Sequence, residues 1–302
     1  MNLSDQTVDA LIIGAGPAGT QCAMVLDNQH IKTAIVNNAP MAGGLQCYNP
    51  YQSDWIATSY KQTGSALADI MEHNLQRPNL LYYGNTYIDA LIENTSDTKS
   101  RFTVLAKTKD AKFHIHARYV ILATGVTPRM GNLTHHSGFI FGPGKNITET
   151  DFTDKKIAIL GGGDNAFENF TYIQSQKARH IDLYAKKIIA RPDLCIGIPE
   201  NQIHIGDVHI NQEMVSVNDE KYDLVCVFYG WQAKYFDKLA IKQELTKNNK
   251  GYLVINGFCQ TSHDSIFAIG EITHRPYPSI VQSMAQGMIA GKKIASNLSH
   301  SA

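Results

Sequence analysis

Apolar residues follow two different patterns in the first 122 positions of the chain. An apolar run over residues 8–14 is followed by the turn AGPAG, a segment with helical spacing over residues 20–29 and a second apolar run over residues 32–38. This order predicts a strand, a helix and a strand, the βαβ unit. From about residue 80 to residue 122, apolar and polar positions alternate in runs separated by turn residues. That alternation predicts an antiparallel meander that leads into a buried strand.

The βαβ pattern begins again at residue 155. Residues 155–187 read as a strand, a glycine turn, a helix and a strand, and a stretch rich in Gly, Pro and Asn over residues 124–146 precedes them. After a polar segment, the chain ends with a short apolar run from Ile266, a loop and an amphipathic segment. We expect that last helix to begin near Pro278 or Ser279. Two separate βαβ units predict two nucleotide-binding units.

Length and composition fit two globular domains. The 302 residues are 43% hydrophobic and 18% charged, and a domain takes roughly 100 to 200 residues. Lys plus Arg and Asp plus Glu each total 27, so no overall field would draw the protein to nucleic acid or to an anionic membrane. We therefore expect no nucleic-acid partner.

The termini and cysteines bear on the cellular setting. No Lys or Arg precedes the first apolar run, which argues against a secretory signal, and no apolar run approaches the roughly 18 to 20 residues of a membrane span. The five cysteines are odd in number and show neither a CxxC pair nor the Cys/His spacing of a zinc site. We expect a cytoplasmic protein with no membrane span and no metal.

The first glycine turn has the GxGxxG spacing and joins an apolar strand to a helix. Its first glycine permits the tight turn, its second lets the backbone approach a pyrophosphate, and its third allows close packing of helix and strand. The second strand ends at Asn37, where an acidic residue commonly binds a ribose and where an amide can bond the same hydroxyl. The alternative is a glycine turn without a ligand. The residues assigned to this cradle are Gly14, Gly16, Pro17, Ala18, Gly19 and Asn37.

A second turn with GxGxxA spacing follows the strand KIAIL and opens another helix. It predicts a second dinucleotide cradle, with a ligand-free turn again as the alternative. The residues assigned to it are Gly161, Gly163, Asp164, Asn165 and Ala166.

The strand after this second turn ends in cations. Lys186, Lys187 and Arg191 stand where an acidic residue would favour an unphosphorylated ribose. Cations there favour a 2′-phosphate, so NADPH is preferred over NADH. The alternative is a solvated basic turn without a ligand.

Two short motifs complete the pattern of a family. Ala123-Thr124-Gly125 ends the meander region, and Gly270-Glu271 precedes the last helix. Together with the two glycine turns, in order and over nearly the whole chain, they resemble the low-molecular-weight thioredoxin reductases. These are flavoproteins with two dinucleotide-binding domains. The resemblance implies that the first turn cradles FAD and the second NADPH.

The resemblance also assigns further residues to the flavin. Glu271 replaces an aspartate that meets the ribitol chain, and GGLQ replaces the order GGQL beside the flavin. Backbone amides at the start of the last helix would face the flavin N1 and C2 carbonyl, where the positive end of a helix stabilises an anionic reduced flavin. Among the cations, Lys186, Lys187 and Arg191 match the family's HRRxxxR, with Lys in place of Arg twice and Ala185 in place of His. The flavin residues implied in this way are Gly43, Gly44, Leu45, Gln46, Ala123, Thr124, Gly125, Gly270, Glu271, Ser279 and Ile280.

One departure from the family decides the chemistry. Thioredoxin reductases carry CxxC ahead of the second glycine turn, but here that stretch is FGPGKNITETDF, and no cysteine occurs between Cys47 and Cys195. Thiol–disulfide exchange needs an attacking thiolate and a resolving partner, so the family's own route to thioredoxin is excluded. A branch of thioredoxin-reductase-like ferredoxin or flavodoxin NADP reductases also lacks CxxC, although its usual aromatic C-terminal extension has no counterpart in NLSHSA.

Other residues are less informative. Cys47 follows the GGLQ turn, where it is either a redox thiol near the flavin or, as we favour, a single buried thiol. The aromatic residues after it either roof a pocket or pack, and the two His pairs are interpreted as surface residues rather than metal ligands. These residues are Tyr48, Tyr51, Trp55, His114, His116, His135 and His136.

The fold expected is α/β, with two Rossmann-like, three-layer dinucleotide-binding domains. An NAD(P)H domain over residues 126–239 is inserted into an FAD domain made of residues 1–125 and 240–302. The function expected is hydride transfer from NADPH to FAD, and then electron transfer to a small redox protein of the ferredoxin or flavodoxin type, a quinone or another small acceptor. The alternatives are a disulfide reductase that uses Cys47 and a non-enzymatic flavin or nucleotide sensor. The family resemblance also implies a homodimer.

Overall fold

The computed structural model describes residues 4–53, 56–94, 100–236 and 238–300, and the chain divides into two compact units. Unit 1 comprises residues 1–126 and 233–302, and unit 2 comprises residues 127–232. The boundaries therefore fall at 126/127 and 232/233, against the expected 125/126 and 239/240. Each unit is built on a sheet with a parallel core, which confirms the predicted α/β fold.

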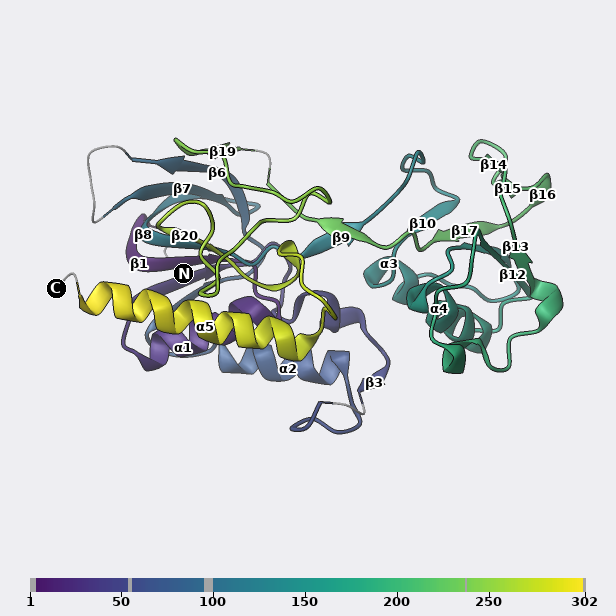
Figure 1. The fold of residues 1–302 in the computed structure, drawn as a ribbon, viewed down its shortest axis with the longest axis horizontal. Coiled ribbons are helices and arrows are strands. Elements are labelled where there is room, and N and C mark those ends of the chain that lie inside the picture. Colours follow the sequence, from purple (N-terminus) through teal and green to yellow (C-terminus); the bar gives the residue numbers. More distant parts are fainter. Residues whose placement is uncertain (1–3, 54–55, 95–99, 237, 301–302) are drawn as a thin grey trace. The chain divides into compact units, whose positions relative to one another are not determined.

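Unit 1 contains the first predicted βαβ unit within its sheet (Figure 1). Strand β1 (Gln6–Ile13) lies parallel to β2 (Thr33–Val36) on one side and to β8 (Lys112–Leu122) on the other, and α1 (Pro17–Asn28) connects β1 to β2. Strand β20 (Ile266–Ala268) pairs in parallel with the end of β8. The carboxyl ends of these parallel strands thus lie at one edge of the sheet.

The predicted meander is correct only in part. Strands β6 (Tyr87–Glu93), β7 (Phe102–Lys107) and β8 pair in antiparallel order, as expected. Strand β5 (Leu80–Tyr83), which the alternation had assigned to the same meander, instead lies parallel to β2 as the outer strand of the Rossmann sheet. The turn at Gly84–Asn85 separates β5 from β6, so one apolar stretch supplies a strand that pairs with β2 and a strand that pairs with β7.

Helix α2 (Gly64–Asn74) was not predicted. Thr63 caps its N-terminus by accepting a hydrogen bond from the Ala66 amide at 3.2 Å. Its buried residues Leu67, Ala68 and Met71 follow helical spacing. Thr63, followed by apolar residues at helical spacing, was the feature of the sequence from which α2 could have been predicted.

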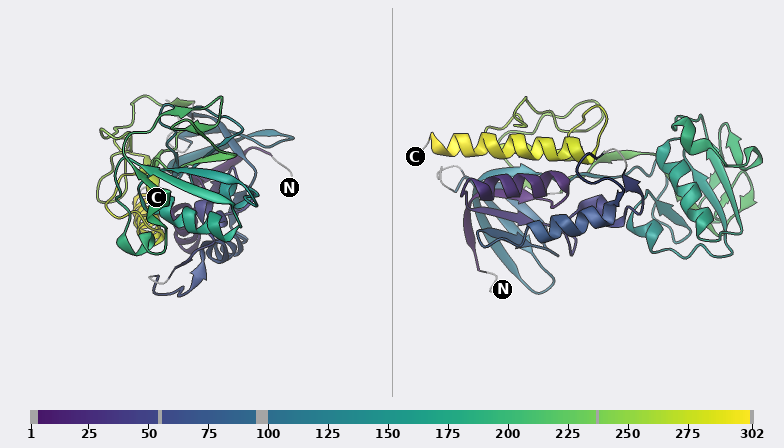
Figure 2. Two further views of the ribbon diagram at one scale, coloured as in Figure 1. Left: turned by 90° about the vertical axis from the view of Figure 1, so that its right-hand side faces the viewer. Right: turned by 90° about the horizontal axis from the view of Figure 1, so that it is seen from below.

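Three layers form unit 1. Helices α1, α2 and α5 (Ile280–Ser299) cover one face of the sheet, and Figure 2 shows α5 running alongside α1. The core between them contains Ile12, Cys22, Leu26 and Phe267. The other face carries a second core, which includes Leu11, Phe102, Val104 and Leu253 and is covered by the β6–β7 layer and by loops. Smaller elements of unit 1 are β3 (Gln52–Ser53), β4 (Gln62–Thr63), β19 (Leu239–Ala240), and the short helices η1 (Gly44–Tyr48) and η4 (Gly270–Ile272).

Unit 2 has a parallel sheet of five strands in the order β10-β17-β11-β12-β13. Helix α4 (Asp164–Ser175) connects β11 to β12 and packs its Phe167, Phe170 and Ile173 on one face. The other face carries a small core that includes Val217 of a three-stranded antiparallel sheet. The strands are β10 (Phe139–Phe141), β11 (Lys156–Leu160), β12 (His180–Ala185), β13 (Ile203–Ile205) and β17 (Leu224–Val227), with β14 (Ile210–Asn211), β15 (Ser216–Val217) and β16 (Glu220–Lys221) in the small sheet.

The remaining elements are short. Strands β9 (Val126–Pro128) and β18 (Trp231–Ala233) pair where the chain passes from one unit to the other. Helices α3 (Lys145–Thr148), η2 (Pro192–Cys195) and η3 (Glu200–Gln202) belong to unit 2. None of the described helices is long and apolar enough to cross a membrane.

Candidate functional site

The first glycine turn is fixed by packing at two of its three glycines. Gly14 has a φ of 109°, and a Cβ there would lie 2.3 Å from the carbonyl oxygen of Ala123. A Cβ at Gly19 would lie 1.9 Å from the carbonyl oxygen of Gly14. No side chain fits at either position, so the turn must run close to both β8 and α1.

Gly16, the middle glycine, is open instead. Within the described part of the chain, no atom lies within 4 Å of a Cβ built on Gly16. Gly16 is the N-cap of α1, and Pro17 begins the helix. Backbone amides in the first turn of a helix have no partner within the helix, so the free space at Gly16 lies beside unpaired hydrogen-bond donors. This combination of tight packing on both sides and an open N-terminus fits a bound pyrophosphate.

The predicted flavin-side turn packs directly against the first glycine turn. The Gly43 amide donates to the carbonyl oxygen of Ala15 at 2.7 Å, and a Cβ at Gly44 would lie 3.3 Å from the Gly16 Cα. Gly43 and Gly44 have φ values of 113° and 58°, which glycine adopts at low cost. Leu45 is exposed. Two sequence motifs 27 positions apart, from Gly16 to Gly43, therefore form one surface.

Asn37 is engaged with the protein. Its side-chain nitrogen donates to the carbonyl oxygens of Ala39 at 3.2 Å and Met41 at 2.8 Å, and the residue is buried. Glu72, on the unpredicted helix α2, accepts from the Ala42 amide at 2.6 Å. Both residues thus hold the loop that leads into the Gly43 turn.

The last glycine motif lies against α1 and α5. The Gly270 amide donates to the side-chain oxygen of Gln286 at 2.7 Å, and a Cβ at Gly270 would lie 3.0 Å from the Ala18 Cβ. A Cβ at Gly287 would lie 2.3 Å from the carbonyl oxygen of Ala18, so α5 and α1 are in close contact. Gln286, which the sequence did not single out, therefore sets the position of the Gly270 turn.

Glu271 is a carboxylate without a protein partner in the part of the chain that the structure describes. It is half-buried, no hydrogen bond or ion pair to it occurs among those residues, and burial raises its pKa. A carboxylate in such a place fits a ligand that offers hydroxyl groups. Helix α5 begins at Ile280 with Ser279 as its cap, as predicted, and Ser279 accepts from the Gln282 amide at 3.2 Å.

The Ala123-Thr124-Gly125 motif connects to the returning chain. The Thr124 hydroxyl donates to the carbonyl oxygen of Lys234 at 2.5 Å, and the Lys234 amide donates to that of Gly125 at 2.9 Å. The carbonyl oxygen of Ala123 packs against Gly14 so closely that a Cβ on Gly14 would clash with it. The motif thus has a structural role besides any contact with a ligand.

The second glycine turn repeats this arrangement in unit 2. Gly161 has a φ of 147°, and a Cβ there would lie 2.6 Å from the carbonyl oxygen of Phe228. Gly163 is the N-cap of α4, and of the described atoms only the Ile189 side chain comes within 4 Å of a Cβ built there. Ala166 is fully buried under the turn. This turn therefore also fits a phosphate-bearing ligand.

The predicted cationic residues lie in a loop after β12 that packs on this turn. Lys186 pairs with Asp207 at 3.2 Å, with both side chains exposed. Arg191 pairs with Asp164, the first residue of α4, at 3.3 Å. Asn165 follows Asp164 on α4, and its carbonyl oxygen accepts from Asn169 at 2.7 Å.

The segment that would carry CxxC contains helix α3 instead. Gly144 caps this helix, and Ile147 is buried in the core of unit 2 at 2% exposure. Cys47 donates its thiol to the carbonyl oxygen of Ala42 at 3.1 Å, and burial raises its pKa. All five cysteines are free thiols.

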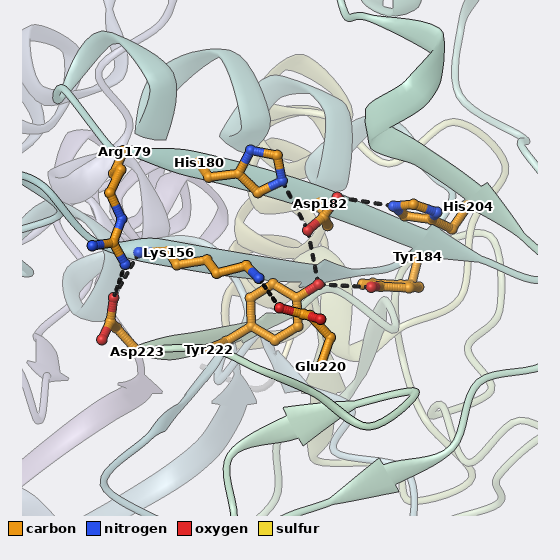
Figure 3. Close-up of polar contacts among 9 residues, drawn as sticks. All are labelled: Lys156, Arg179, His180, Asp182, Tyr184, His204, Glu220, Tyr222 and Asp223. Atoms are coloured by element: carbon orange, nitrogen blue, oxygen red, sulfur yellow. Dashed lines mark hydrogen bonds and ion pairs between the residues drawn. The ribbon is translucent and has the colours of Figure 1, made fainter.

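A polar network in unit 2 was missed by the sequence reasoning. Asp182 on β12 accepts from the Nε2 atoms of His180 at 3.0 Å and His204 at 2.9 Å and from the Tyr222 hydroxyl at 2.8 Å (Figure 3). The Tyr184 hydroxyl lies 2.7 Å from that of Tyr222. The alternation of polar residues along HIDLYA was the available signal.

The predicted surface residues have ordinary polar contacts. His114 pairs with Asp5 at 3.3 Å, and His116 lies 3.1 Å from the Thr103 hydroxyl. Within the described ranges, no three His, Cys, Asp or Glu side chains are arranged to hold a metal ion. Trp55 lies outside the described residues.

Comparison with known proteins decides the family. The sequence profile of the family described as "Pyridine nucleotide-disulphide oxidoreductase" matches residues 8–194 and 198–287. The chain belongs to this family. As a member, it is an FAD-dependent NAD(P)H oxidoreductase, and its cofactors are FAD and NADPH, as the sequence predicted.

Individual relatives are similar over nearly the whole length of the chain. Thioredoxin reductase of Peptoclostridium acidaminophilum is 23% identical over 95% of both chains. A 34.2 kDa protein in the rubredoxin operon of Clostridium pasteurianum is 24% identical over 95% of this chain and 96% of the relative. The bacillithiol disulfide reductase Bdr of Bacillus cereus has the same fold, with a TM-score of 0.79 at 17% identity over 97% of this chain and all of that one.

Proposed function

We propose that this oxidoreductase passes electrons from NADPH through FAD directly to an external acceptor, without a protein disulfide. The observation that carries this proposal is α3, which stands in the segment where the redox pair of a thioredoxin reductase would be. Its buried Ile147 belongs to the core and has no redox chemistry. Electrons must then leave from the flavin itself.

Unit 1 is proposed to hold FAD. The open N-terminus of α1 at Gly16 would take the pyrophosphate, and Glu271 would accept hydroxyl groups of the ribitol chain. The Ser279 and Ile280 end of α5 would supply positive helix-dipole potential to the flavin ring. When bound, FAD accepts a hydride and returns electrons, so the protein contributes binding, orientation and electrostatics.

Unit 2 is proposed to hold NADPH. The Gly163 end of α4 is almost as open as the Gly16 end of α1, with only the Ile189 side chain, among the described atoms, at 3.9 Å from a Cβ built there. The loop with Lys186, Lys187 and Arg191 follows the neighbouring strand β12. Backbone amides and cations at such a place favour a phosphorylated ribose.

The acceptor is proposed to be a small redox protein of the ferredoxin or flavodoxin type, a quinone or another small molecule. The relative encoded in a rubredoxin operon supports a small redox protein. We also propose that the protein is a homodimer and that it works in the cytoplasm, where free thiols such as its five cysteines persist.

A disulfide reductase that uses Cys47 is the second candidate, suggested by the position of this thiol after the Gly43 turn. Two observations count against it. Its thiol is engaged with the Ala42 carbonyl oxygen, and its raised pKa disfavours the thiolate that attacks a disulfide. A flavin or nucleotide sensor would bind both cofactors but turn over slowly with every acceptor.

One experiment tests the proposal. The purified protein, loaded with FAD, is titrated anaerobically with NADPH and with NADH, and the reduced protein is mixed with ferricyanide, quinones, ferredoxin, flavodoxin, rubredoxin and thioredoxin. Bleaching of the flavin followed by rapid reoxidation with a non-thiol acceptor supports it. Reoxidation by thioredoxin alone would refute it, and slow reoxidation by every acceptor would support the sensor.

A further inference from the structure

The loop over residues 186–191, here called the coenzyme loop, is attached to the second glycine turn by its own backbone. The amides of Ile189 and Ala190 both donate to the carbonyl oxygen of Gly162, at 2.7 and 3.0 Å. A Cβ at Gly162 would lie 2.0 Å from the carbonyl oxygen of Lys187, so only glycine permits this contact. The loop therefore has a defined position relative to the turn.

Arg191 ends this loop and is attached to α4 twice through the same carboxylate. Its backbone amide donates to Asp164 Oδ1 at 2.9 Å, and its guanidinium Nε lies 3.3 Å from Asp164 Oδ2. Asp164 is the first residue of α4, next to the open Gly163. The pair thus joins the end of the loop to the end of the cradle.

Two more carboxylates surround the same guanidinium. Arg191 lies 3.8 Å from Glu168 and 3.8 Å from Asp193. The pKa of Glu168 is raised by burial and by the neighbouring Asp164, although Arg191 opposes this. A phosphate dianion that approached Arg191 would have to displace carboxylates and would be repelled by those that remain.

The two lysines are in a different situation. The Lys186–Asp207 pair has side chains that are 80% and 93% exposed, and such a pair costs little to break. Lys187 is exposed, and no ion pair to it occurs in the described ranges. The loop thus offers a phosphate two accessible ammonium groups and one guanidinium that is already surrounded by acids.

We propose that Arg191 is a positioning residue, which holds the coenzyme loop on α4 through Asp164, and that Lys187 is the main cation for the 2′-phosphate of NADPH. This inference rests on the proposed assignment of unit 2 to the coenzyme. It reverses the role that the family pattern HRRxxxR suggests for its last arginine. NADPH preference then depends on lysine, a point charge without the bidentate geometry of arginine.

The test compares ligands that differ by the 2′-phosphate. Binding of adenosine 2′,5′-bisphosphate and of 5′-AMP to the FAD-loaded protein is measured by calorimetry, and the rate of flavin reduction by NADPH and NADH by anaerobic stopped flow. Lys187→Met should weaken the bisphosphate by about tenfold and leave 5′-AMP within about twofold. Arg191→Met should weaken both ligands by a similar factor of about two to five, so their ratio stays within about twofold. Arg191→Lys, which keeps a charge for Asp164, should recover most of the lost affinity.

A double-mutant cycle and a control complete the design. Asp164→Ala and Arg191→Met should be partly non-additive, because both changes remove the contact between the guanidinium and the carboxylate, whereas only Asp164→Ala also removes the hydrogen bond from the Arg191 amide. Arg179→Met removes a cation from the same unit, one that is 64% exposed and precedes β12, and should change neither ligand. If Arg191→Met abolishes the bisphosphate preference while Lys187→Met does not, the inference is wrong. If the wild-type protein binds neither ligand and neither coenzyme reduces its flavin, the proposed function fails, and this inference fails with it.

Discussion

Tyr222 donates its hydroxyl hydrogen to the carboxylate of Asp182 across 2.8 Å, and this contact attaches the connection between the two sheets of unit 2 to the parallel sheet. Tyr222 lies between β16 and β17, whereas Asp182 lies in the middle of β12. Because the Tyr222 hydrogen is given to Asp182, the Tyr184 hydroxyl at 2.7 Å must donate to Tyr222. The order of donors in this network is therefore determined.

The histidines of the network follow from the same reasoning. An ionised carboxylate only accepts hydrogen bonds, so His180 and His204 both carry hydrogen on Nε2. Burial alone would raise the pKa of Asp182. The hydrogen bonds from His204 and Tyr222 and the charge interactions with both imidazoles outweigh burial, and the pKa is lowered. Two ion pairs lie beside the network, Lys156–Glu220 and Arg179–Asp223 (Figure 3).

We expect Asp182→Asn to destabilise unit 2 by about 2 to 4 kcal/mol, because three donors lose a buried ionised acceptor. Hydrogen exchange at the β12 and β13 amides, followed by mass spectrometry, measures the effect within the full chain. Asp207→Asn is the control, since its carboxylate is almost fully exposed. Equal exchange rates in the two variants would show that the network contributes nothing.

The same carboxylate gives a pH dependence with a defined sign. A lowered pKa in the folded state means that Asp182 contributes stability above the ordinary aspartate value of 3.8 and loses it as the pH falls through the lower folded value. Unfolding measured between about pH 5 and pH 2 should therefore show an acid loss in the wild type that is smaller in Asp182→Asn. Parallel curves for the two proteins would contradict this expectation.

Gly16→Val should abolish FAD retention while the fold survives. The new side chain meets no described atom of the protein within 4 Å at its Cβ, so it would occupy only the space proposed for the pyrophosphate. Gly19→Val is the contrast, because its Cβ would lie 1.9 Å from the Gly14 carbonyl oxygen and should disturb folding itself. Flavin absorbance per protein and circular dichroism separate the two. A Gly16→Val protein that stays yellow would refute the assignment.

Local patterns in the sequence were enough for the elements that carry glycine turns. The spacing of Gly14, Gly16 and Gly19 predicted the end of a strand and the start of a helix, and in the structure β1 ends at Ile13 and α1 begins at Pro17. Strand β5 was misassigned because alternation along residues 80–94 does not say which neighbour a strand will pair with. Parallel pairing of Leu80 with Thr33 joins residues 47 positions apart, which no local pattern encodes.

Contacts between distant residues limited the prediction of the site in the same way. Gln286 looked like an ordinary helix residue, yet it binds the Gly270 amide. Arg191 matched a family motif, and only the fold brings Glu168 beside it. Residue type gave the chemistry in each case, while the partner came from tertiary structure.

NADPH should reduce the flavin more efficiently than NADH, by about tenfold to a hundredfold, since charge-assisted contacts of roughly 1.5 to 3 kcal/mol act only on the phosphorylated coenzyme. Replacing both Lys186 and Lys187 by Ala should remove most of this difference by lowering the NADPH rate. The second-order rates from anaerobic stopped flow give the ratio directly. Equal rates for the two coenzymes in the wild type would contradict it.

The absence of CxxC predicts how electrons leave the protein. With Ile147 in the core where a redox pair would otherwise be, an acceptor must reach the flavin. Ferricyanide and quinones should then be reduced by NADPH, and thioredoxin should not.

Cys47→Ser should leave these rates within about twofold, because the Cys47 thiol is bonded to Ala42 and its raised pKa keeps it protonated. Steady-state assays with each acceptor measure this. Rapid thioredoxin reduction by the wild type that disappears in Cys47→Ser would instead establish a thiol mechanism.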